Sequence, residues 1–213
     1  MYYGCDTNSN SFPCTNGGHP FYIGRMGGGT SSGGTGFNTN AATSVGPGYT
    51  YGYWDIEGLG TSTVNATTLS EAYQWGQQQA QAARSAWNAN SYVGRSTIFG
   101  DVERGNTGIG VSSALDQQVY LGFIRELNSL AGVSGVYSSP GEWNAIMGSS
   151  YSASPATSIW SAAWLSGACN TCPTSITGSG FGGYAPTIWQ YNGNTGNNTP
   201  CPADLDCAVA LPA

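Results

Sequence analysis

Residues 96–105, STIFGDVERG, place two carboxylates at alternate positions directly after a short apolar run. Alternate residues of a strand share a face, so Asp101 and Glu103 are expected to point the same way. Two like charges held this close repel each other, which raises the pKa of at least one carboxyl group. The pair therefore indicates a site in which one carboxyl stays protonated near neutral pH, or in which a cation lies between the two.

Seven of the eleven acidic residues lie at or beside the C-terminal ends of apolar segments that read as strands. These seven are Asp6, Asp55, Glu57, Asp101, Glu103, Asp204 and Asp206. Helix caps or exposed helical faces account for the other four. In a β/α barrel the C-terminal ends of the strands meet around one mouth, which is where such enzymes keep their chemistry. We therefore expect the seven carboxylates to converge on one cleft.

An acid cluster with few basic partners suits two kinds of chemistry. Its oxygens can bind a hard cation such as calcium or magnesium, or it can perform general acid–base catalysis, as in glycoside cleavage. The single histidine, His19, lies in a predicted loop, so a Ser-His-Asp triad is not expected. We favour acid–base chemistry and expect neither a cofactor nor a metal site.

The composition restricts the partners of the chain. Of its 213 residues 8% are charged and 12% aromatic; there is no lysine, and five arginines face eleven acids for a net charge of -6. A nucleic-acid surface needs cations that this chain lacks, and no apolar run reaches the ~20 residues of a membrane span. An uncharged polar surface rich in aromatics favours neutral sugars, whose apolar ring faces stack on Trp and Tyr, although aromatics are more often core residues.

Six cysteines, an even number, indicate structural disulfides and hence a secreted, extracellular protein. The simplest connectivity is local: Cys5 with Cys14, Cys169 with Cys172, and Cys201 with Cys207. A bond between Cys5 and Cys207 is the alternative if the first and last strands are neighbours. A redox or zinc site at the CNTC motif is a further alternative, but zinc would need two more suitably spaced ligands.

Strand and helix patterns alternate along the chain. Thr68 and Glu71 form a capping box before a helix that extends to about Asn88, and Ser113 with Asp116 caps a second helix that should stop at Gly132. A short helix is expected around residues 143–147, and residues 27–49 read as a long loop. The strands are expected at 1–6, 20–29, 49–58, 96–103, 134–139, 158–165, 186–193 and 203–211.

This order of elements predicts an α/β fold, an irregular (β/α) TIM-like barrel with few helices, spanning residues 1–213 as a single domain. An open Rossmann-type sheet is the structural alternative.

Six short motifs follow one another along the chain: YYGCD, FYIGRMGGG, FGDVERG, GVYSSPGEW, IWSAAW and IWQY with ADLD. In this order they resemble the motifs of glycoside hydrolase family 25, the lysozyme-like N-acetylmuramidases, or of the related glycoside-hydrolase-like domains. The resemblance implies cleavage of the β-1,4 bond between N-acetylmuramic acid and N-acetylglucosamine of peptidoglycan. The sequence departs from the family at Asp206, where an Asn is usual, and at YWDIEG, which carries Asp55 and Glu57 where the family has no carboxylates.

The resemblance also implies the roles of single residues. Glu103 is expected to be the general acid and Asp101 the residue that tunes it, with Asp6 and Asp204 completing a set of four carboxylates. The aromatic residues that match sugar-site or barrel-lining positions of the family are Tyr53, Tyr137, Trp160, Trp164, Trp189 and Tyr191. Asp55 and Glu57 lie outside the family pattern; we expect them to bind substrate in an altered subsite, with an extra catalytic role or a cation site as the alternatives.

Other functions stay open at this point. A non-catalytic glycan-binding or cell-wall-associated barrel, a hydrolase of a different cell-wall polysaccharide, and a cation-binding structural protein are the alternatives. We expect a monomer whose partner is a peptidoglycan-like polysaccharide.

Overall fold

The computed structural model describes residues 1–8, 20–31, 36–59, 67–89, 94–131, 133–165, 172, 175–176, 179–193 and 204–213. Its eight strands are β1 (Tyr2–Thr7), β2 (Phe21–Gly28), β3 (Thr50–Asp55), β4 (Ile98–Asp101), β5 (Ser134–Ser138), β6 (Ser158–Ala162), β7 (Ile188–Asn192) and β8 (Asp204–Ala208). Its helices are α1 (Thr39–Val45), α2 (Leu69–Ala89), α3 (Ser113–Ala131) and α4 (Pro140–Met147), with a 3-10 turn at Pro47–Tyr49.

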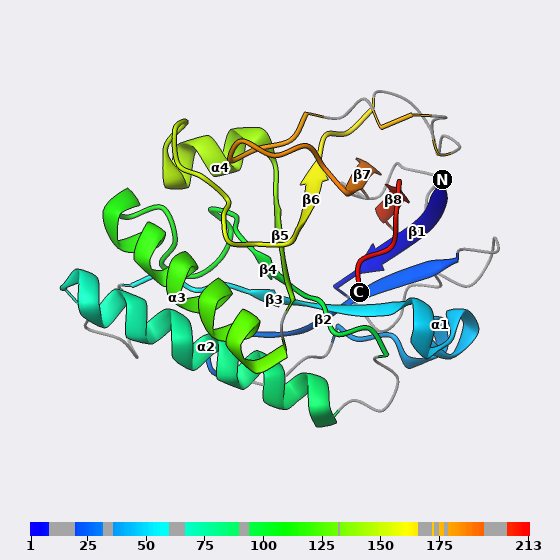
Figure 1. Ribbon diagram of the computed structural model, residues 1–213, viewed down its shortest axis with the longest axis horizontal. Helices are drawn as coiled ribbons and strands as arrows, with labels where there is room; N and C mark the ends of the chain where they lie inside the picture. The colour runs from blue at the N-terminus through cyan, green and yellow to red at the C-terminus, as the bar shows by residue number, and fades with distance from the viewer. Residues whose placement is uncertain are drawn as a thin grey trace.

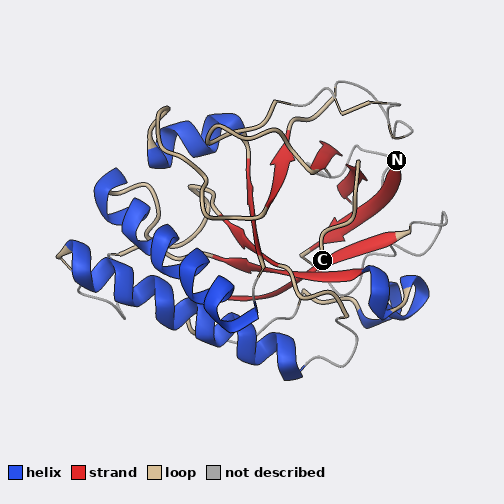
Figure 2. Ribbon diagram, viewed as in Figure 1, coloured by secondary structure: helices blue, strands red, loops and turns tan. Residues whose placement is uncertain are grey.

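The strands form a closed barrel in chain order, with the helices on its outside (Figures 1 and 2). Strands β1 to β7 are parallel, whereas β8 runs antiparallel to both β7 and β1. The predicted irregular α/β barrel is confirmed, and the open sheet is wrong because β8 closes the gap between β7 and β1. The C-terminal ends of seven strands and the N-terminal end of β8 therefore form one mouth.

Aromatic side chains fill the barrel because alternate residues of short apolar strands point inward. Trp160 of β6 lies at the centre of this packing, with its ring 5.5 Å from Phe99, 5.9 Å from Tyr53 and 4.3 Å from Tyr137, centroid to centroid. The wide ring of a buried tryptophan leaves neighbouring side chains few alternative positions. This cluster forms a rigid floor beneath the mouth.

Helices α2 and α3 run side by side against the outside of the barrel (Figure 1). A Cβ at Gly76 would lie 2.0 Å from the Val119 carbonyl oxygen, and one at Gly122 would lie 2.1 Å from that of Tyr73. The two glycines thus allow the helix backbones to approach closely. The capping box of α2 is confirmed, since the Thr68 N–H donates to Glu71 Oε2 at 2.9 Å and the Glu71 N–H to Thr68 Oγ1 at 3.2 Å.

Two local predictions are wrong. Residues 27–49 are not one loop, because helix α1 lies within them, capped by Asn38 Oδ1, which accepts from the Ala41 N–H at 3.0 Å. A seven-residue helix is too short to show a repeating apolar pattern. Ser113 is the first residue of α3 rather than its cap, and Asp116 accepts instead from the Gly110 N–H at 3.0 Å.

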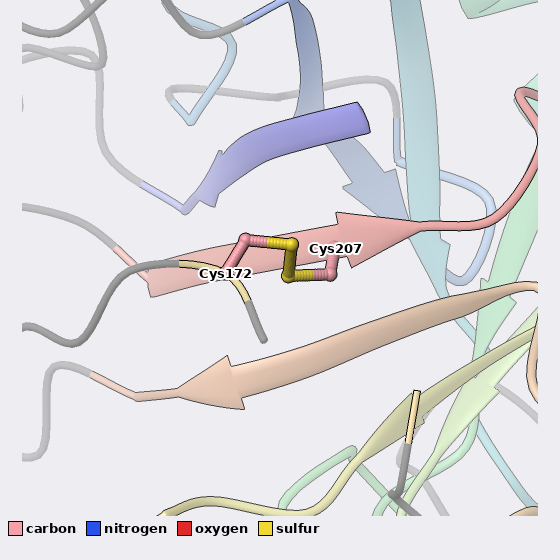
Figure 3. Close-up of a disulfide and its surroundings, with 2 residues drawn as sticks. All are labelled: Cys172 and Cys207. Atoms are coloured by element: carbon pink, nitrogen blue, oxygen red, sulfur yellow. A yellow bond between two sulfur atoms is a disulfide. The ribbon is translucent and has the colours of Figure 1, made fainter. Parts of the chain in front are cut away.

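The disulfide pairing differs from the local scheme. Cys172 is bonded to Cys207 of β8 (Figure 3), which excludes Cys169 with Cys172, Cys201 with Cys207, and Cys5 with Cys207. Cys207 is the fourth residue of β8 and lies opposite Trp189 in register, so the extended strand carries it away from the segment before β8. Cys5 is disulfide-bonded as well, and its predicted partner Cys14 lies outside the described residues. Among the described helices none is long and apolar enough to cross a membrane.

Candidate active site

The mouth of the barrel holds a hollow of about 290 Å³ at the strand ends. Its walls carry five carboxylates, one arginine, three aromatic rings and a glutamine. These residues are Asp6, Asp55, Asp101, Glu103, Asp204, Arg25, Tyr53, Tyr137, Trp160 and Gln190. The four residues expected to be catalytic thus lie around one hollow, as the strand-end argument requires.

The strand register explains this convergence. Asp6 of β1 lies opposite Asp204 of β8, and Asp55 of β3 lies opposite Asp101 of β4, which in turn lies opposite Tyr137 of β5. Residues directly opposite on neighbouring strands have adjacent side chains on the same face. Carboxylates from four strands therefore point into the same space.

The deepest carboxyls belong to Asp6 and Asp206, which we call the floor pair. Gln190 Nε2 donates to Asp6 Oδ2 at 2.8 Å, and Trp160 Nε1 donates to Asp206 Oδ1 at 2.8 Å. Burial raises the pKa of both carboxyls well above the usual range, and the charge of Asp206 raises that of Asp6 further. The two side chains are within hydrogen-bonding range of each other, so a proton on either carboxyl can be shared with the other.

Asp101 and Glu103, which we call the rim pair, lie at the end of β4 and just beyond it. Burial is the main cause that raises the pKa of Asp101 well above its usual range, and the Glu103 charge adds to it. Burial also raises the pKa of Glu103, followed by the charges of Glu142 and Asp55. Asp101 is buried whereas Glu103 is partly exposed. The raised pKa values favour the protonated form in the rim pair as well, and Glu103 lies where a ligand in the hollow can reach it.

The Tyr137 hydroxyl connects the two pairs. It donates to Gln190 Oε1 at 2.9 Å, while the Gln190 amide nitrogen donates to Asp6. The Tyr137 hydroxyl also lies within hydrogen-bonding range of Glu103. A continuous polar chain thus runs from the floor of the barrel to the rim.

Arg25 and Asp55 form an ion pair on one wall, with Arg25 Nε donating to Asp55 Oδ2 at 2.8 Å. Burial raises the pKa of Asp55, and Arg25 opposes that shift. Arg25 is the one cationic side chain among the described residues that line the hollow. This ion pair makes Asp55 the carboxylate of the hollow that Arg25 neutralises.

Glu57 is not among the residues that line the hollow. Its main chain is fixed elsewhere, because the Glu57 N–H donates to Gln79 Oε1 at 2.8 Å and its carbonyl accepts from Trp75 Nε1 at 2.9 Å. Of the residues expected to bind substrate on this segment, Tyr53 and Asp55 line the hollow, whereas Glu57 lies two residues beyond the end of β3 at Asp55.

The predicted aromatic residues divide into three groups. Tyr53, Tyr137 and Trp160 line the hollow, whereas Trp189 and Tyr191 are buried outside it, with Trp189 Nε1 donating to the Ala163 carbonyl at 2.8 Å. Trp164 alone is exposed and lines a second hollow of about 370 Å³ beside Glu103.

Sequence reasoning placed Asp206 among the seven converging carboxylates but gave it no role, and it did not assign Arg25 or Gln190 to the site. Asp206 alternates with Asp204 and so shares its face. Gln190 lies on the inward face of β7 with Ile188, which the structure shows and the sequence pattern does not. In the described part of the chain no three carboxylate, cysteine or histidine side chains are grouped so as to hold a metal ion.

Several solved structures share this fold over almost the whole chain. A muramidase from Trichobolus zukalii is 19% identical with a TM-score of 0.67, covering 99% of this chain and 95% of its own. A family GH25 lysozyme from Aspergillus fumigatus is 19% identical with a TM-score of 0.66, covering 99% and 94%. A bacterial lysozyme from Streptomyces coelicolor is 18% identical with a TM-score of 0.59, covering 98% and 92%.

No protein-family model and no curated protein sequence matches the chain. At this identity the solved structures show the fold, so the resemblance to glycoside hydrolase family 25 is confirmed at that level. The chain has the irregular α/β barrel of the family 25 lysozymes.

Proposed function

We propose that the protein is a glycoside hydrolase that cleaves a β-1,4 bond in an N-acetylated cell-wall glycan, as a muramidase of peptidoglycan does. The observation that carries the proposal is the hollow at the barrel mouth, where carboxyls with raised pKa values surround a space of about 290 Å³. Glycosidases need one protonated and one ionised carboxyl near the scissile bond. The shared fold of the muramidases named above supports the same reaction.

In this mechanism Glu103 is the general acid. It donates its proton to the glycosidic oxygen as the bond from that oxygen to the anomeric carbon breaks, and it is left as a carboxylate that can take a proton from water. The proton is available because burial and the neighbouring charges raise the Glu103 pKa. Partial exposure of Glu103 gives the substrate access to it.

The remaining carboxylates stabilise the positive charge that develops on the sugar. Asp101 is adjacent to Glu103, and Asp6 and Asp204 lie opposite one another on β1 and β8. Fixed charges in a site that excludes water act more strongly than the same charges in bulk solvent. The N-acetyl group of the substrate can also assist bond cleavage from within the sugar.

The proposed setting is extracellular. The Cys172–Cys207 disulfide and a second disulfide through Cys5 support an oxidising compartment. A single chain supplies the set of carboxylates that the proposed reaction needs, so we propose that the protein acts on its glycan as a monomer.

The test is cleavage of purified peptidoglycan, followed by the fall in turbidity and by mass spectrometry of the released fragments. Glu103→Gln should lower the rate by about 10²–10⁴-fold, the usual contribution of general acid catalysis. Glu126→Gln is the matched control, because Glu126 lies on the outside of the barrel, where it accepts hydrogen bonds from Gln77 and Gln81. Failure of the wild type to cleave any wall glycan, or an unchanged rate in Glu103→Gln, would contradict the proposal.

A further inference from the structure

The second hollow at the barrel mouth adjoins the first. Glu103 and Gly105 line both, and Ser139, Glu142, Ala162 and Trp164 complete the second. The proposed acid is therefore part of the wall between two spaces that each approach the size of a sugar-binding site.

Trp164 is the unusual residue of this hollow. Its side chain is 55% exposed, whereas the other six tryptophans of the chain are buried. A large aromatic surface left in water is unfavourable by the ordinary measure of apolar burial. An exposed tryptophan beside a reactive carboxyl thus indicates a surface on which a ligand is placed.

The Trp164 ring is also fixed in place. Its Nε1 donates to Gln190 Oε1 at 2.9 Å, and Gln190 is 2% exposed and held by Tyr137 and Asp6. The ring packs directly on the backbone of Gly193, where a Cβ would lie 2.5 Å from Trp164 Cε2. A side chain held from two directions presents its ring at little further cost in conformational entropy.

We propose that the hollow at Trp164 is the binding subsite for the leaving sugar, a neutral pyranose of an N-acetylated glycan. This inference rests on the proposed function and names the part of the substrate that occupies the second hollow. The sugar that gains positive charge belongs in the first hollow, among Asp6, Asp101 and Asp204. Because Glu103 protonates the oxygen between the two sugars, the leaving sugar lies on the other side of Glu103.

The chemistry of the second hollow fits a pyranose. The apolar face of the ring stacks on the indole of Trp164. Glu142 is held by the ion pair with Arg104, in which Arg104 Nη2 donates to Glu142 Oε1 at 2.7 Å, and together with Ser139 it gives the hollow a polar edge for sugar hydroxyls.

The test compares two substrates in Trp164→Ala. The first is a defined soluble tetrasaccharide of peptidoglycan, and the second is the corresponding disaccharide fluoride, whose leaving group is a single atom. We expect kcat/KM for the tetrasaccharide to fall about tenfold, the value of one good aromatic contact, and kcat/KM for the fluoride to stay within about twofold. Equal losses on both substrates, or no loss on either, overturn the subsite.

Three further variants test whether the loss in Trp164→Ala comes from the missing ring face and its position. Trp164→Phe retains a ring face and should recover most of the tetrasaccharide activity. Gly193→Ala displaces the ring without removing it and should lower activity on the tetrasaccharide alone. Tyr49→Ala is the control, because Tyr49 is also exposed but precedes β3, at the opposite end of the barrel.

Failure of the subsite and failure of the proposed function are distinguishable. If the wild type cleaves neither substrate, calorimetric titration of the tetrasaccharide into the wild type and into Trp164→Ala measures the subsite alone. A tenfold weaker affinity of the variant then supports the subsite in a protein that binds glycan without cleaving it. Equal affinities overturn it.

Discussion

Two carboxyl pairs lie at the barrel mouth, and they differ in surroundings and access. The floor pair, Asp6 and Asp206, is buried between β1 and β8, and Trp160 and Gln190 each donate a hydrogen bond to one member. The rim pair, Asp101 and Glu103, has one buried member and one partly exposed member beside both hollows. Both pairs have raised pKa values with burial as the main cause.

The comparison shows that a raised pKa does not by itself identify a catalytic acid. Raised pKa values favour the protonated form in both pairs, but of the four carboxyls Glu103 alone is partly exposed at the hollow. Asp206 is buried outside the lining of the hollow, and Trp160 donates a hydrogen bond to it. We therefore expect the rim pair to control the rate and Asp206 to affect mainly the stability of the fold.

The largest expected effect is on the rim pair. Asp101→Asn removes the charge beside Glu103 and should lower kcat on peptidoglycan fragments by about 10²–10³-fold, as the loss of one preorganised electrostatic group does. The proposed reaction needs Asp101 as a carboxylate when Glu103 gives up its proton, and an amide cannot supply that charge. Single-turnover rates of the variant and wild type measure the effect. A rate within a factor of three of the wild type would show that the two pairs do not differ in this way.

In the floor pair we expect a substitution to change the stability of the fold and to leave kcat nearly unchanged. Asp206 Oδ2 accepts no N–H hydrogen bond from the described residues. The Asp6 carboxyl is the polar group within its range. Asp206→Asn supplies an amide N–H there, and its oxygen still accepts from Trp160. We expect the free energy of unfolding at pH 7 to rise by roughly 1 kcal/mol, since the amide N–H can donate to Asp6 without placing a second like charge beside it. The kcat should stay within about threefold of the wild type.

The same variant should alter the pH dependence of stability. In the wild type the folded floor pair has pKa values above the unfolded value of about 3.9, so the folded state binds more protons than the unfolded state. The stability that this pair contributes is fully present below about pH 4 and is lost as pH rises through the folded pKa values. Thermal unfolding from pH 4 to pH 8 should show a weaker decline in Asp206→Asn. An unchanged or steeper decline would mean that the pair is ionised in the folded protein.

Much of this site could be predicted from the strand ends. Asp6, Asp55 and Asp101 end apolar runs, and a parallel barrel brings such ends together whatever their separation in the chain. Glu57 could not be excluded from the pattern, because its alternation with Asp55 continues beyond the point at which β3 ends. Where a strand stops depends on its neighbours and not on its own residues.

The direction of β8 accounts for most of what the sequence did not reveal. Its local pattern is the same whether it runs parallel or antiparallel, but the antiparallel direction places Asp206 beside Asp6 and Cys207 near Cys172. On β7 the alternation separates Trp189 and Tyr191 from Gln190, yet nothing in the pattern says which set points inward. The side that points inward is set by contacts with residues far away in the chain, such as the hydrogen bond from Gln190 to Asp6.

The smallest expected effect is a change in the pKa of Glu103 caused by a substitution of Glu142, which lies on helix α4. The Glu142 charge raises the pKa of Glu103, second only to burial, and Glu142 is itself paired with Arg104. Glu142→Gln removes that negative charge and leaves Arg104 as an unpaired cation beside the rim, so both changes lower the Glu103 pKa. Because the acid must be protonated, the alkaline limb of the kcat/KM profile should move to lower pH, whereas Glu126→Gln should leave it in place. A limb that stays in place or moves to higher pH in Glu142→Gln would mean that the titrating acid is not Glu103, and that the rim pair, like the floor pair, retains a proton that the reaction does not use.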